Sequence, residues 1–336
     1  MLEVASGVAQ APTRSRTDGR EPRSAGIAAI GAAVPERAVA NEAIGERVGV
    51  DGDWIASRTG VHERRVAAPD ATLTELAVDA TRPALERAGI APSDIDLVLV
   101  ATSTPDEIVP NAAPLVAERI GASHAGAIDI GAACTGFVSA LDIAAATVES
   151  GRADVVLTIG AELMSRVIDY EDKRTAGLFG DGAGAAIVVP GGRGRIGPIR
   201  LHSDGAGSRN VTASHAERKI RMDGRATFRA AVARLSEVTL EVVDDAGVSL
   251  DDIDLFVYHQ ANSRILSSVG ERLSLPRERV VDSLARYGNT SAASVPIALD
   301  EAHGDGRLED GSTVLLAAFG AGLTWGAGIV EWGEAR

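Results

Sequence analysis

The chain contains AGIAPSDIDLVLVATST at residues 88–104 and repeats the pattern as AGVSLDDIDLFVYHQAN at residues 246–262. Both copies share the frame Ala-Gly-(Ile/Val)-x-x-x-Asp-Ile-Asp-Leu, and they begin 158 positions apart. Each follows an amphipathic helical pattern, residues 73–89 and 228–247, that ends at a glycine suited to a helix C-cap. Helix, cap, loop and buried strand therefore recur as one unit.

Two further matches keep nearly the same spacing. ALDIA at residues 140–144 and ALDEA at residues 298–302 are also 158 positions apart, and the apolar runs ADVVLTIGAE and STVLLAAFGAG are offset by about 160. Three matches in one order indicate an internal duplication, with a period too long for a solenoid. Strands alternating with helices in each half predict two α/β units with mostly buried sheets.

The composition limits the class of protein. Hydrophobic residues make up 45% of the 336 residues but aromatic residues only 3%, so Ala, Val, Leu and Ile must form most of the core. One cysteine excludes an intramolecular disulfide and a multi-cysteine metal site. Nothing therefore indicates secretion, and the cytoplasm is the expected location.

Charge and hydropathy exclude other classes. The net charge of −14 disfavours nucleic-acid binding, and no run of about 18 uncharged apolar residues predicts a membrane span. Residues 1–25 contain four arginines and no apolar segment of signal-peptide length, so we expect a disordered tail.

The single cysteine, Cys134, lies in AACTGF, between the strand-like GAIDIGAA and a helical pattern that ends before Gly151. Unpaired N–H groups and the helix dipole at such a junction favour a thiolate, so we expect a lowered pKa for Cys134. A cysteine in an apolar setting is more commonly inert, and a nucleophile needs partners.

Two polar residues are candidate partners. His259 directly follows the buried strand LFVY, at the sheet edge where open α/β sheets place ligands and catalytic groups. Asn289 lies in YGNTSAAS, close to Ala292, which corresponds to Cys134 in the repeat. The two halves are expected to face each other there, although an asparagine before a helix is more commonly a cap or turn residue.

Two glycine-rich segments, FGDGAGAAIVV from Phe179 and FGAGLTWGAG from Phe319, predict tight turns that enter strands. Neither follows the nucleotide-binding patterns Gly-x-Gly-x-x-Gly or the P-loop, so nucleotide binding through them is disfavoured.

Taken together, AACTGF, HQANSRI and GNTSAAS resemble the β-ketoacyl-acyl-carrier-protein synthase III family of the thiolase superfamily. DWIASRTGVHERR, FGDGAGAA and FGAGLTWG extend the resemblance, in family order, from Gly26 to Glu331. It implies an α/β, duplicated thiolase-like fold of five layers (α-β-α-β-α), with a mixed, mostly parallel sheet in each half, and a homodimer. The expected parts are the tail 1–25, an N-terminal half 26–190 and a C-terminal half 191–336.

The resemblance also implies the chemistry. Cys134, His259 and Asn289 match the family's catalytic Cys-His-Asn set, and the backbone N–H groups of Cys134 and Ala321 match its oxyanion hole. The reaction implied is a decarboxylative condensation of an acyl-CoA with malonyl-acyl-carrier protein, without a cofactor or metal. A thiolase would need a second cysteine, and chain-elongating synthases have a histidine in place of Asn289.

Substrate contacts follow from the same resemblance. The residues that match CoA-binding positions are Trp54, Arg58, Lys173, Arg174 and Asn262, of which Asn262 would hold a water or orient His259. Arg264 matches the site that docks acyl carrier protein, and Arg218, Lys219, Arg221, Arg272 and Arg277 could extend it. Val109 matches the end of the acyl pocket, supplied by the dimer partner. Its small side chain, and the short segment 204–224 expected at the entrance, are compatible with longer or branched primers.

The sequence leaves the pathway open and allows two competing functions. The enzyme could initiate fatty-acid synthesis or prime a polyketide-type pathway. It could instead transfer an acyl group from Cys134 to an oxygen or nitrogen nucleophile, for which an acidic residue would suit the position of Asn289 better. A non-catalytic partner subunit of the same fold is disfavoured because the Cys-His-Asn set is intact.

Overall fold

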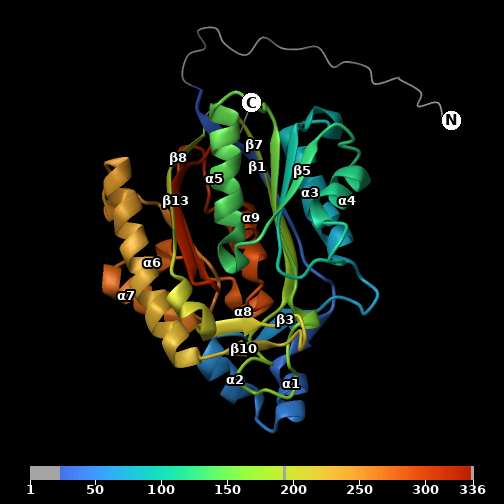
Figure 1. Cartoon of the computed structure of the whole chain (residues 1–336). Helices are drawn as coiled ribbons and strands as arrows, with labels where there is room; N and C mark the ends of the chain where they lie inside the picture. Colours follow the sequence, from blue (N-terminus) through green and yellow to red (C-terminus); the bar gives the residue numbers. More distant parts are fainter. Residues whose placement is uncertain (1–22, 192–193, 334–336) are drawn as a thin grey trace, which may run out of the picture.

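The computed structural model describes residues 23–191 and 194–333, and Figure 1 shows two sheets with helices between and around them. Residues 1–22 of the expected tail lie outside the described residues. The expected tail boundary at residue 25 is wrong, because Ala25 is fully buried and pairs with Pro190 as the first residue of a strand. The expected division at residues 190 and 191 falls between β7 and β8.

The first sheet has the strand order β1-β7-β6-β4-β5. Its strands are β1 (Ala25–Ala33), β7 (Asp181–Pro190), β6 (Val156–Leu163), β4 (Leu97–Ala101) and β5 (Gly126–Ile130). β4 pairs in parallel with β5 and β6, while β7 is antiparallel to both of its neighbours. All of these strands except β7 therefore run in one direction.

The second sheet repeats this plan with the order β11-β12-β13-β8. Its strands are β11 (Leu255–Tyr258), β12 (Thr313–Gly320), β13 (Thr324–Glu331) and β8 (Arg195–Ser203). Here β13 is the reversed strand, at the position of β7. Phe256 of β11 forms a parallel bridge with Val280, and this bridge corresponds to the pairing of β4 with β5 in the first sheet. The expected mixed, mostly parallel sheets are confirmed.

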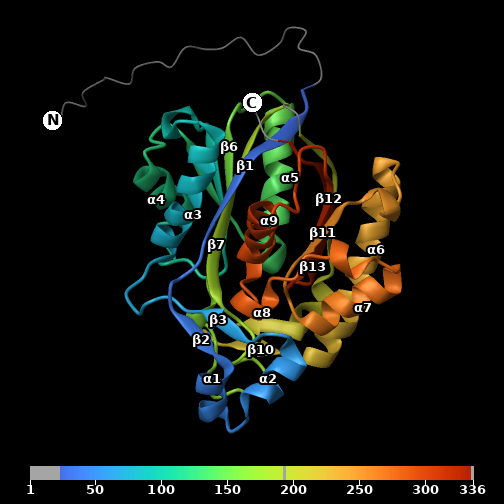
Figure 2. The same ribbon diagram turned by 180° about the vertical axis from the view of Figure 1, so that it is seen from behind.

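Helices complete the layers, as Figures 1 and 2 show. Between the sheets lie α5 (Gly136–Glu149) and α9 (Ser294–Gly304), which contact strands of both. The outer face of the first sheet carries α3 (Leu73–Ala88) and α4 (Ala112–Ile120), and that of the second carries α6 (Gly224–Ala246) and α7 (Ser263–Leu273). The expected five-layered, duplicated thiolase-like fold is confirmed.

The repeated helices end as the sequence predicts. α3 and α6 stop at Gly89 and Gly247, whose φ angles of 62° and 67° lie in the left-handed region that glycine adopts without strain. α6 begins before the expected residue 228, because the Asp223 side chain accepts hydrogen bonds from Arg225 N and Ala226 N and caps the helix there.

Alanine-rich packing allows the middle layer to approach closely. A Cβ at Gly160 of β6 would lie 2.3 Å from the carbonyl oxygen of Ala292, which precedes α9. Ala292, Ala144 and Ala298 are fully buried in this region. Small side chains therefore allow two helices to pack between two sheets, in agreement with the low aromatic content of the chain.

The remaining elements gather mostly at the lower end in Figure 1 or in connections. They are α1 (Asn41–Val48), α2 (Gly52–Thr59), α8 (Leu284–Tyr287), β2 (Ala38–Ala40), β3 (Glu63–Arg65), β9 (Val211–Ala213), β10 (Ile220–Met222) and short 3-10 turns at 92–94, 133–135, 164–166, 205–210, 250–252, 277–279 and 291–293. Within residues 23–191 and 194–333, no helix is both long and apolar enough to cross a membrane.

Candidate active site

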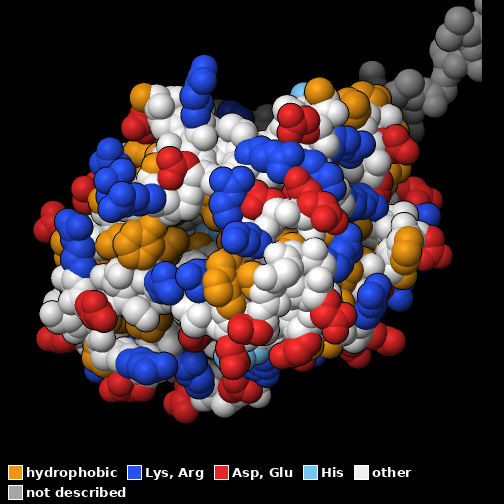
Figure 3. Space-filling model, turned by 90° about the horizontal axis from the view of Figure 1, so that it is seen from below, with side chains coloured by type: hydrophobic (Ala, Val, Ile, Leu, Met, Phe, Trp, Pro, Cys, Tyr) orange, Lys and Arg blue, Asp and Glu red, His pale blue; other side chains and the backbone are white. Residues whose placement is uncertain are grey.

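A cavity of about 810 Å³ lies at the carboxyl ends of the parallel strands. Cys134, His259 and Asn289 all line it, so the structure brings together the three residues that the sequence assigned to one site. Segments of β9 and β10 line the cavity with Val211, Ile220 and Met222, all within residues 204–224, and a role of this segment at the entrance remains a prediction. Figure 3 shows the molecule from this end.

Cys134 sits in the 3-10 turn η2 (Ala133–Thr135), directly before α5. The preceding Ala133 has a φ of 47°, a left-handed conformation that costs a non-glycine residue free energy and marks a constrained turn. Thr135 fixes the turn, because its Oγ1 donates to Ala132 O at 2.6 Å and lies 2.8 Å from Thr324 Oγ1 of β13. The nucleophile is thereby held by both halves of the chain.

The pKa of the Cys134 thiol is raised to about 11, mainly by burial; the hydrogen bond with Ser291 acts to lower it, and the charge of Glu162 acts to raise it. The expectation of a lowered pKa is therefore wrong for the free site. Cys134 precedes α5 by two residues rather than capping it, and removal of water from the sulfur outweighs the field of the helix terminus.

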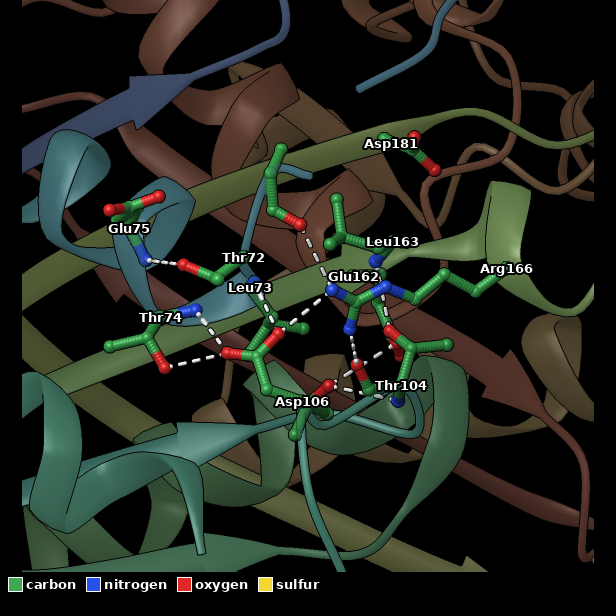
Figure 4. A network of polar contacts seen from close by, with 12 residues as sticks. Thr72, Leu73, Thr74, Glu75, Thr104, Asp106, Glu162, Leu163, Arg166 and Asp181 are labelled. Atoms are coloured by element: carbon green, nitrogen blue, oxygen red, sulfur yellow. Dashed lines mark hydrogen bonds and ion pairs between the residues drawn. The ribbon is translucent and has the colours of Figure 1, made fainter. Parts of the chain in front are cut away.

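The sulfur contacts a buried polar chain that the sequence analysis missed. The Cys134 thiol lies 3.5 Å from Ser291 Oγ, and Ser291 Oγ donates to Glu162 Oε1 at 2.9 Å. Figure 4 shows Glu162 close to Thr104, in the network that also includes Asp106 and Arg166. A charged residue in the otherwise uncharged, wholly buried strand TIGAEL was the signal that could have indicated it.

His259 follows β11 and is 1% exposed. Burial lowers the pKa of its imidazole to about 3, so the ring is neutral at physiological pH. Its Nδ1 lies 2.5 Å from Ser294 Oγ, and the same oxygen accepts a hydrogen bond from Gln260 N at 3.3 Å. Ser294, on α9, is thus the residue that orients the ring.

Asn289 is held in the loop before α9 by its own side chain. Its Oδ1 accepts a hydrogen bond from Ser291 N at 2.9 Å, and its Nδ2 lies 3.4 Å from Ala261 O. The first bond fixes which end of the amide is the oxygen, because a backbone N–H can only donate. Because an amide nitrogen carries two hydrogens, Nδ2 keeps one for a further acceptor, and Asn289 lines the cavity.

The predicted oxyanion donors lie where the two halves meet. A Cβ on Gly320 would be 2.8 Å from Cys134 N, so the end of β12 passes directly against the backbone of the nucleophile. Ala321, the next residue, lines the cavity. The role of the two N–H groups remains a prediction.

Aromatic and basic residues lie at the α2 side of the cavity. The guanidinium carbon of Arg58 is 4.1 Å from the ring centre of Trp54, and the ammonium nitrogen of Lys173 is 5.9 Å from it. Arg174 also lines the cavity but binds the Asp172 carboxylate, with Nη2 2.7 Å from Oδ2. Of the two basic neighbours, Lys173 therefore lies beside the Trp54 ring, whereas the Arg174 charge is paired with Asp172.

The hydrogen bonds of the Asn262 side chain are not to His259, which it was expected to orient. Its Oδ1 caps α7 by accepting from Arg264 N, and its Nδ2 donates to Arg58 O at 3.0 Å. Asn262 therefore ties α7 to α2, while Ser294 orients His259. Arg264 is exposed at the cavity rim, where its side chain donates to Ser57 O at 2.9 Å.

Comparisons with known proteins agree with this geometry. Residues 128–205 match the family model for 3-oxoacyl-[acyl-carrier-protein] synthase III, and residues 243–332 match the model for its C-terminal part. A β-ketoacyl-[acyl-carrier-protein] synthase III from Bacillus cereus is 42% identical over 311 residues, which cover 92% of this chain and 99% of the relative. The chain belongs to the β-ketoacyl-acyl-carrier-protein synthase III family.

Solved structures of the family have the same fold. The 3-oxoacyl-[acyl-carrier-protein] synthase III of Aquifex aeolicus is 40% identical with a TM-score of 0.90, over 92% of this chain and all of that one. The priming β-ketosynthase of the R1128 polyketide pathway is 37% identical with a TM-score of 0.90, over 95% of this chain and 99% of that one.

In this member of the synthase III family, Val109 is not among the residues that line the cavity. Val109 and its neighbour Ile108 are each 80% exposed, on the loop between β4 and α4. Such exposure of two adjacent aliphatic residues favours a contact with another molecule. Its position is compatible with the expectation that this loop serves a partner subunit.

Proposed function

We propose that this chain is a β-ketoacyl-acyl-carrier-protein synthase III, an acyltransferase that condenses an acyl-CoA primer with malonyl-acyl-carrier protein. The convergence of Cys134, His259 and Asn289 on one cavity is the observation that carries the proposal. A partly buried thiol that lines the cavity supplies a nucleophile, while a neutral imidazole and an amide supply two hydrogen-bond donors for a developing negative charge.

In the first half-reaction, the Cys134 sulfur attacks the carbonyl carbon of the acyl-CoA thioester. The bond from that carbon to the CoA sulfur breaks, and the proton lost from Cys134 is balanced by the one gained by CoA. The backbone N–H groups of Cys134 and Ala321 are proposed to stabilise the tetrahedral oxyanion, a role in which one donor contributes about 10²–10³ in rate.

In the second half-reaction, the malonyl group loses CO₂ and leaves an enolate. Ser294 Oγ accepts the N–H of Gln260, which leaves the Ser294 hydroxyl hydrogen free to donate to Nδ1 of His259. In that tautomer Nε2 of His259 carries the other proton and, with Asn289 Nδ2, donates to the enolate oxygen. The enolate carbon then attacks the acyl-cysteine, and Cys134 leaves and regains a proton.

The cavity entrance suits the two carriers. Trp54 is proposed to stack on the CoA adenine, with Arg58 and Lys173 near its phosphates, since planar aromatic and cationic groups recognise these parts. Arg264 is proposed to dock the carrier protein. Figure 3 shows Lys and Arg side chains interspersed with Asp and Glu side chains on this face, so the positive surface for docking must be local.

The proposed assembly is a cytoplasmic homodimer, in which Val109 of one subunit closes the acyl pocket of its partner. The exposed pair Ile108 and Val109 supports a subunit contact at this loop. A valine at the pocket end leaves room for a branched or longer primer than a bulky aromatic would.

Intact-protein mass spectrometry tests the proposal. The protein is incubated with acetyl-, branched and medium-chain acyl-CoAs and then with malonyl-acyl-carrier protein, with Cys134→Ala as the control. We expect a mass gain on the wild type only, discharged as β-ketoacyl-carrier protein. Charging followed by transfer to an oxygen or nitrogen acceptor would replace condensation with simple acyl transfer, and no charging by any primer would exclude the nucleophilic role.

A further inference from the structure

A fully buried carboxylate lies beneath the cavity. Glu162 is the penultimate residue of β6 and has no exposed surface. Burying a carboxylate costs free energy unless hydrogen-bond donors replace the lost water. The surroundings of Glu162 must therefore supply such donors. It is not part of the Cys-His-Asn set, and it does not line the cavity.

The groups around Glu162 are arranged as donors. Ser103 N lies 3.2 and 3.1 Å from its two oxygens, Thr104 Oγ1 lies 2.6 Å from Oε2, and Ser291 Oγ lies 2.9 Å from Oε1. Thr104 Oγ1 itself accepts the N–H of Leu163 at 2.8 Å, which leaves its hydroxyl hydrogen for Glu162. Because an ionised carboxylate only accepts, this arrangement matches the charged form, although burial acts to raise the pKa of Glu162.

Ser291 connects this carboxylate to the nucleophile. Its Oγ lies 2.9 Å from Glu162 and 3.5 Å from the Cys134 sulfur, but a serine hydroxyl has only one hydrogen to donate. A charge-assisted bond to a carboxylate is the stronger of the two choices. The hydrogen therefore points to Glu162, and Ser291 presents a lone pair to Cys134.

We propose that Glu162 is a positioning residue that, by holding the hydroxyl hydrogen of Ser291, keeps the Cys134 sulfur protonated in the free enzyme. Ser291 then accepts from the thiol instead of stabilising a thiolate, and the negative charge of Glu162 opposes a second negative charge nearby. Burial is the main cause of the raised pKa of Cys134, and the charge of Glu162 acts in the same direction. The inference concerns the nucleophile of the proposed function, but its readout needs no acyl substrate.

The test is the pH dependence of alkylation by iodoacetamide, which reports on Cys134 because it is the only cysteine. In Glu162→Gln the charge is lost, and the new amide N–H can donate to Ser291 Oγ and release its hydrogen toward the sulfur. We expect the Cys134 pKa to fall by at least about one unit, so that alkylation at pH 8 becomes about tenfold faster.

Two controls separate this effect from general loosening. Asp106→Asn alters a largely buried carboxylate of the same network, which accepts from Leu73 N and Thr74 N and pairs with Arg166 (Figure 4). Glu118→Gln removes one charge from the exposed surface of α4. Both are expected to leave the alkylation profile within about 0.3 pH units of the wild type, because neither carboxylate contacts Ser291.

A double-mutant cycle with Ser291→Ala tests the path. We expect Glu162→Gln to shift the profile less when Ser291 is absent, because no hydroxyl hydrogen can then be redirected to the sulfur. An equal shift in both backgrounds would overturn the role of Ser291. An unchanged profile in folded Glu162→Gln, or a shift to higher pH, would overturn the role of Glu162.

The proposal stays testable if Glu162→Gln does not fold. Wild-type alkylation is expected to keep rising above pH 8.5, the usual pKa of a free cysteine. A plateau below that pH would overturn the proposal. So would a rise of more than one unit in the Cys134 pKa in Ser291→Ala, because that result requires Ser291 to donate to the sulfur in the wild type. If the pH profile of alkylation is as expected but no acyl-CoA charges Cys134, only the proposed function is overturned.

Discussion

The turns η2 (Ala133–Thr135) and η7 (Ser291–Ala293) are equivalent parts of the duplication and carry different chemistry. Ala133 and Ser291 are 158 positions apart, and their φ angles of 47° and 50° are nearly equal. The next residue is Cys134 in one turn and Ala292, fully buried, in the other. The duplication thus kept a constrained backbone in both halves, while only one turn presents a nucleophile to the cavity.

The strands beneath the turns differ for a related reason. The β6 end lies beneath η7 and carries Glu162, which binds Ser291. The equivalent residue of β12 is Gly320, which lies against Cys134 and has no room for a side chain. Each half therefore supports the turn of the other, and the site exists only when both halves are packed together.

Replacement of Asn289 should give the largest effect on the chemistry. Its equivalent in the first half is Gly131, which has no donor. For Asn289→Ala we expect decarboxylative condensation to slow about 10²–10³-fold, because one enolate donor is removed, while acyl charging of Cys134 persists. Single-turnover mass spectrometry measures both steps. Equal loss of charging and condensation would contradict the division of roles.

Gly320→Ala tests the contact between β12 and η2. The new Cβ would lie 2.8 Å from Cys134 N, so the nucleophile must move. We expect about 1–3 kcal/mol lower stability from overpacking, and about 10²-fold slower charging because a displacement of about 1 Å misaligns the attack. Gly270→Ala is the matched control, since nothing lies within 4 Å of its added Cβ. Normal charging in Gly320→Ala would show that the contact is not critical.

His259 is titratable, whereas its equivalent on β4, Ala101, is not. The two halves therefore differ in how these positions affect stability as the pH changes. The pKa of His259 is about 3 in the folded chain and about 6.5 when unfolded, so the unfolded chain gains a proton first as the pH falls. Stability is fully retained above pH 6.5 and is lost progressively below it, by about 2 kcal/mol at pH 5.

Urea unfolding at pH 7.5 and pH 5.0 measures this loss. His259→Ala makes the position match its counterpart in the first half, and its fall in unfolding free energy should be smaller than that of the wild type by the same amount. Identical falls in the two proteins would mean that His259 is not held neutral by burial.

Trp54 lies on α2, outside the repeated frame, and should give the smallest effect. For Trp54→Ala we expect the KM for acyl-CoA to rise about tenfold with little change in kcat, because loss of base stacking weakens binding without touching the reacting atoms. Ser57→Ala on the same helix is the control, since that side chain donates only to Trp54 O. A fall in kcat alone would contradict this role.

The sequence by itself determined the duplication, the alternation of strands and helices in each half and the C-terminal ends of the repeated helices, because strand and helix periods, glycine caps and buried apolar runs are local properties. The order of the five layers was implied by the family resemblance. It also indicated His259 and Asn289, since both follow such signals within the repeated frame. Cys134 was located by its motif, but its state was not: proximity to a helix suggested a lowered pKa, whereas enclosure by both halves raises it.

Only the tertiary structure decided which residues support the site. Ser294 contacts His259, and Glu162 reaches Cys134 through Ser291, over separations of 35 and more than 100 positions. These contacts arise where two sheets and two central helices close on each other. Dehydration and hydrogen-bond partners set the protonation of a buried group, and both depend on residues that are distant in sequence.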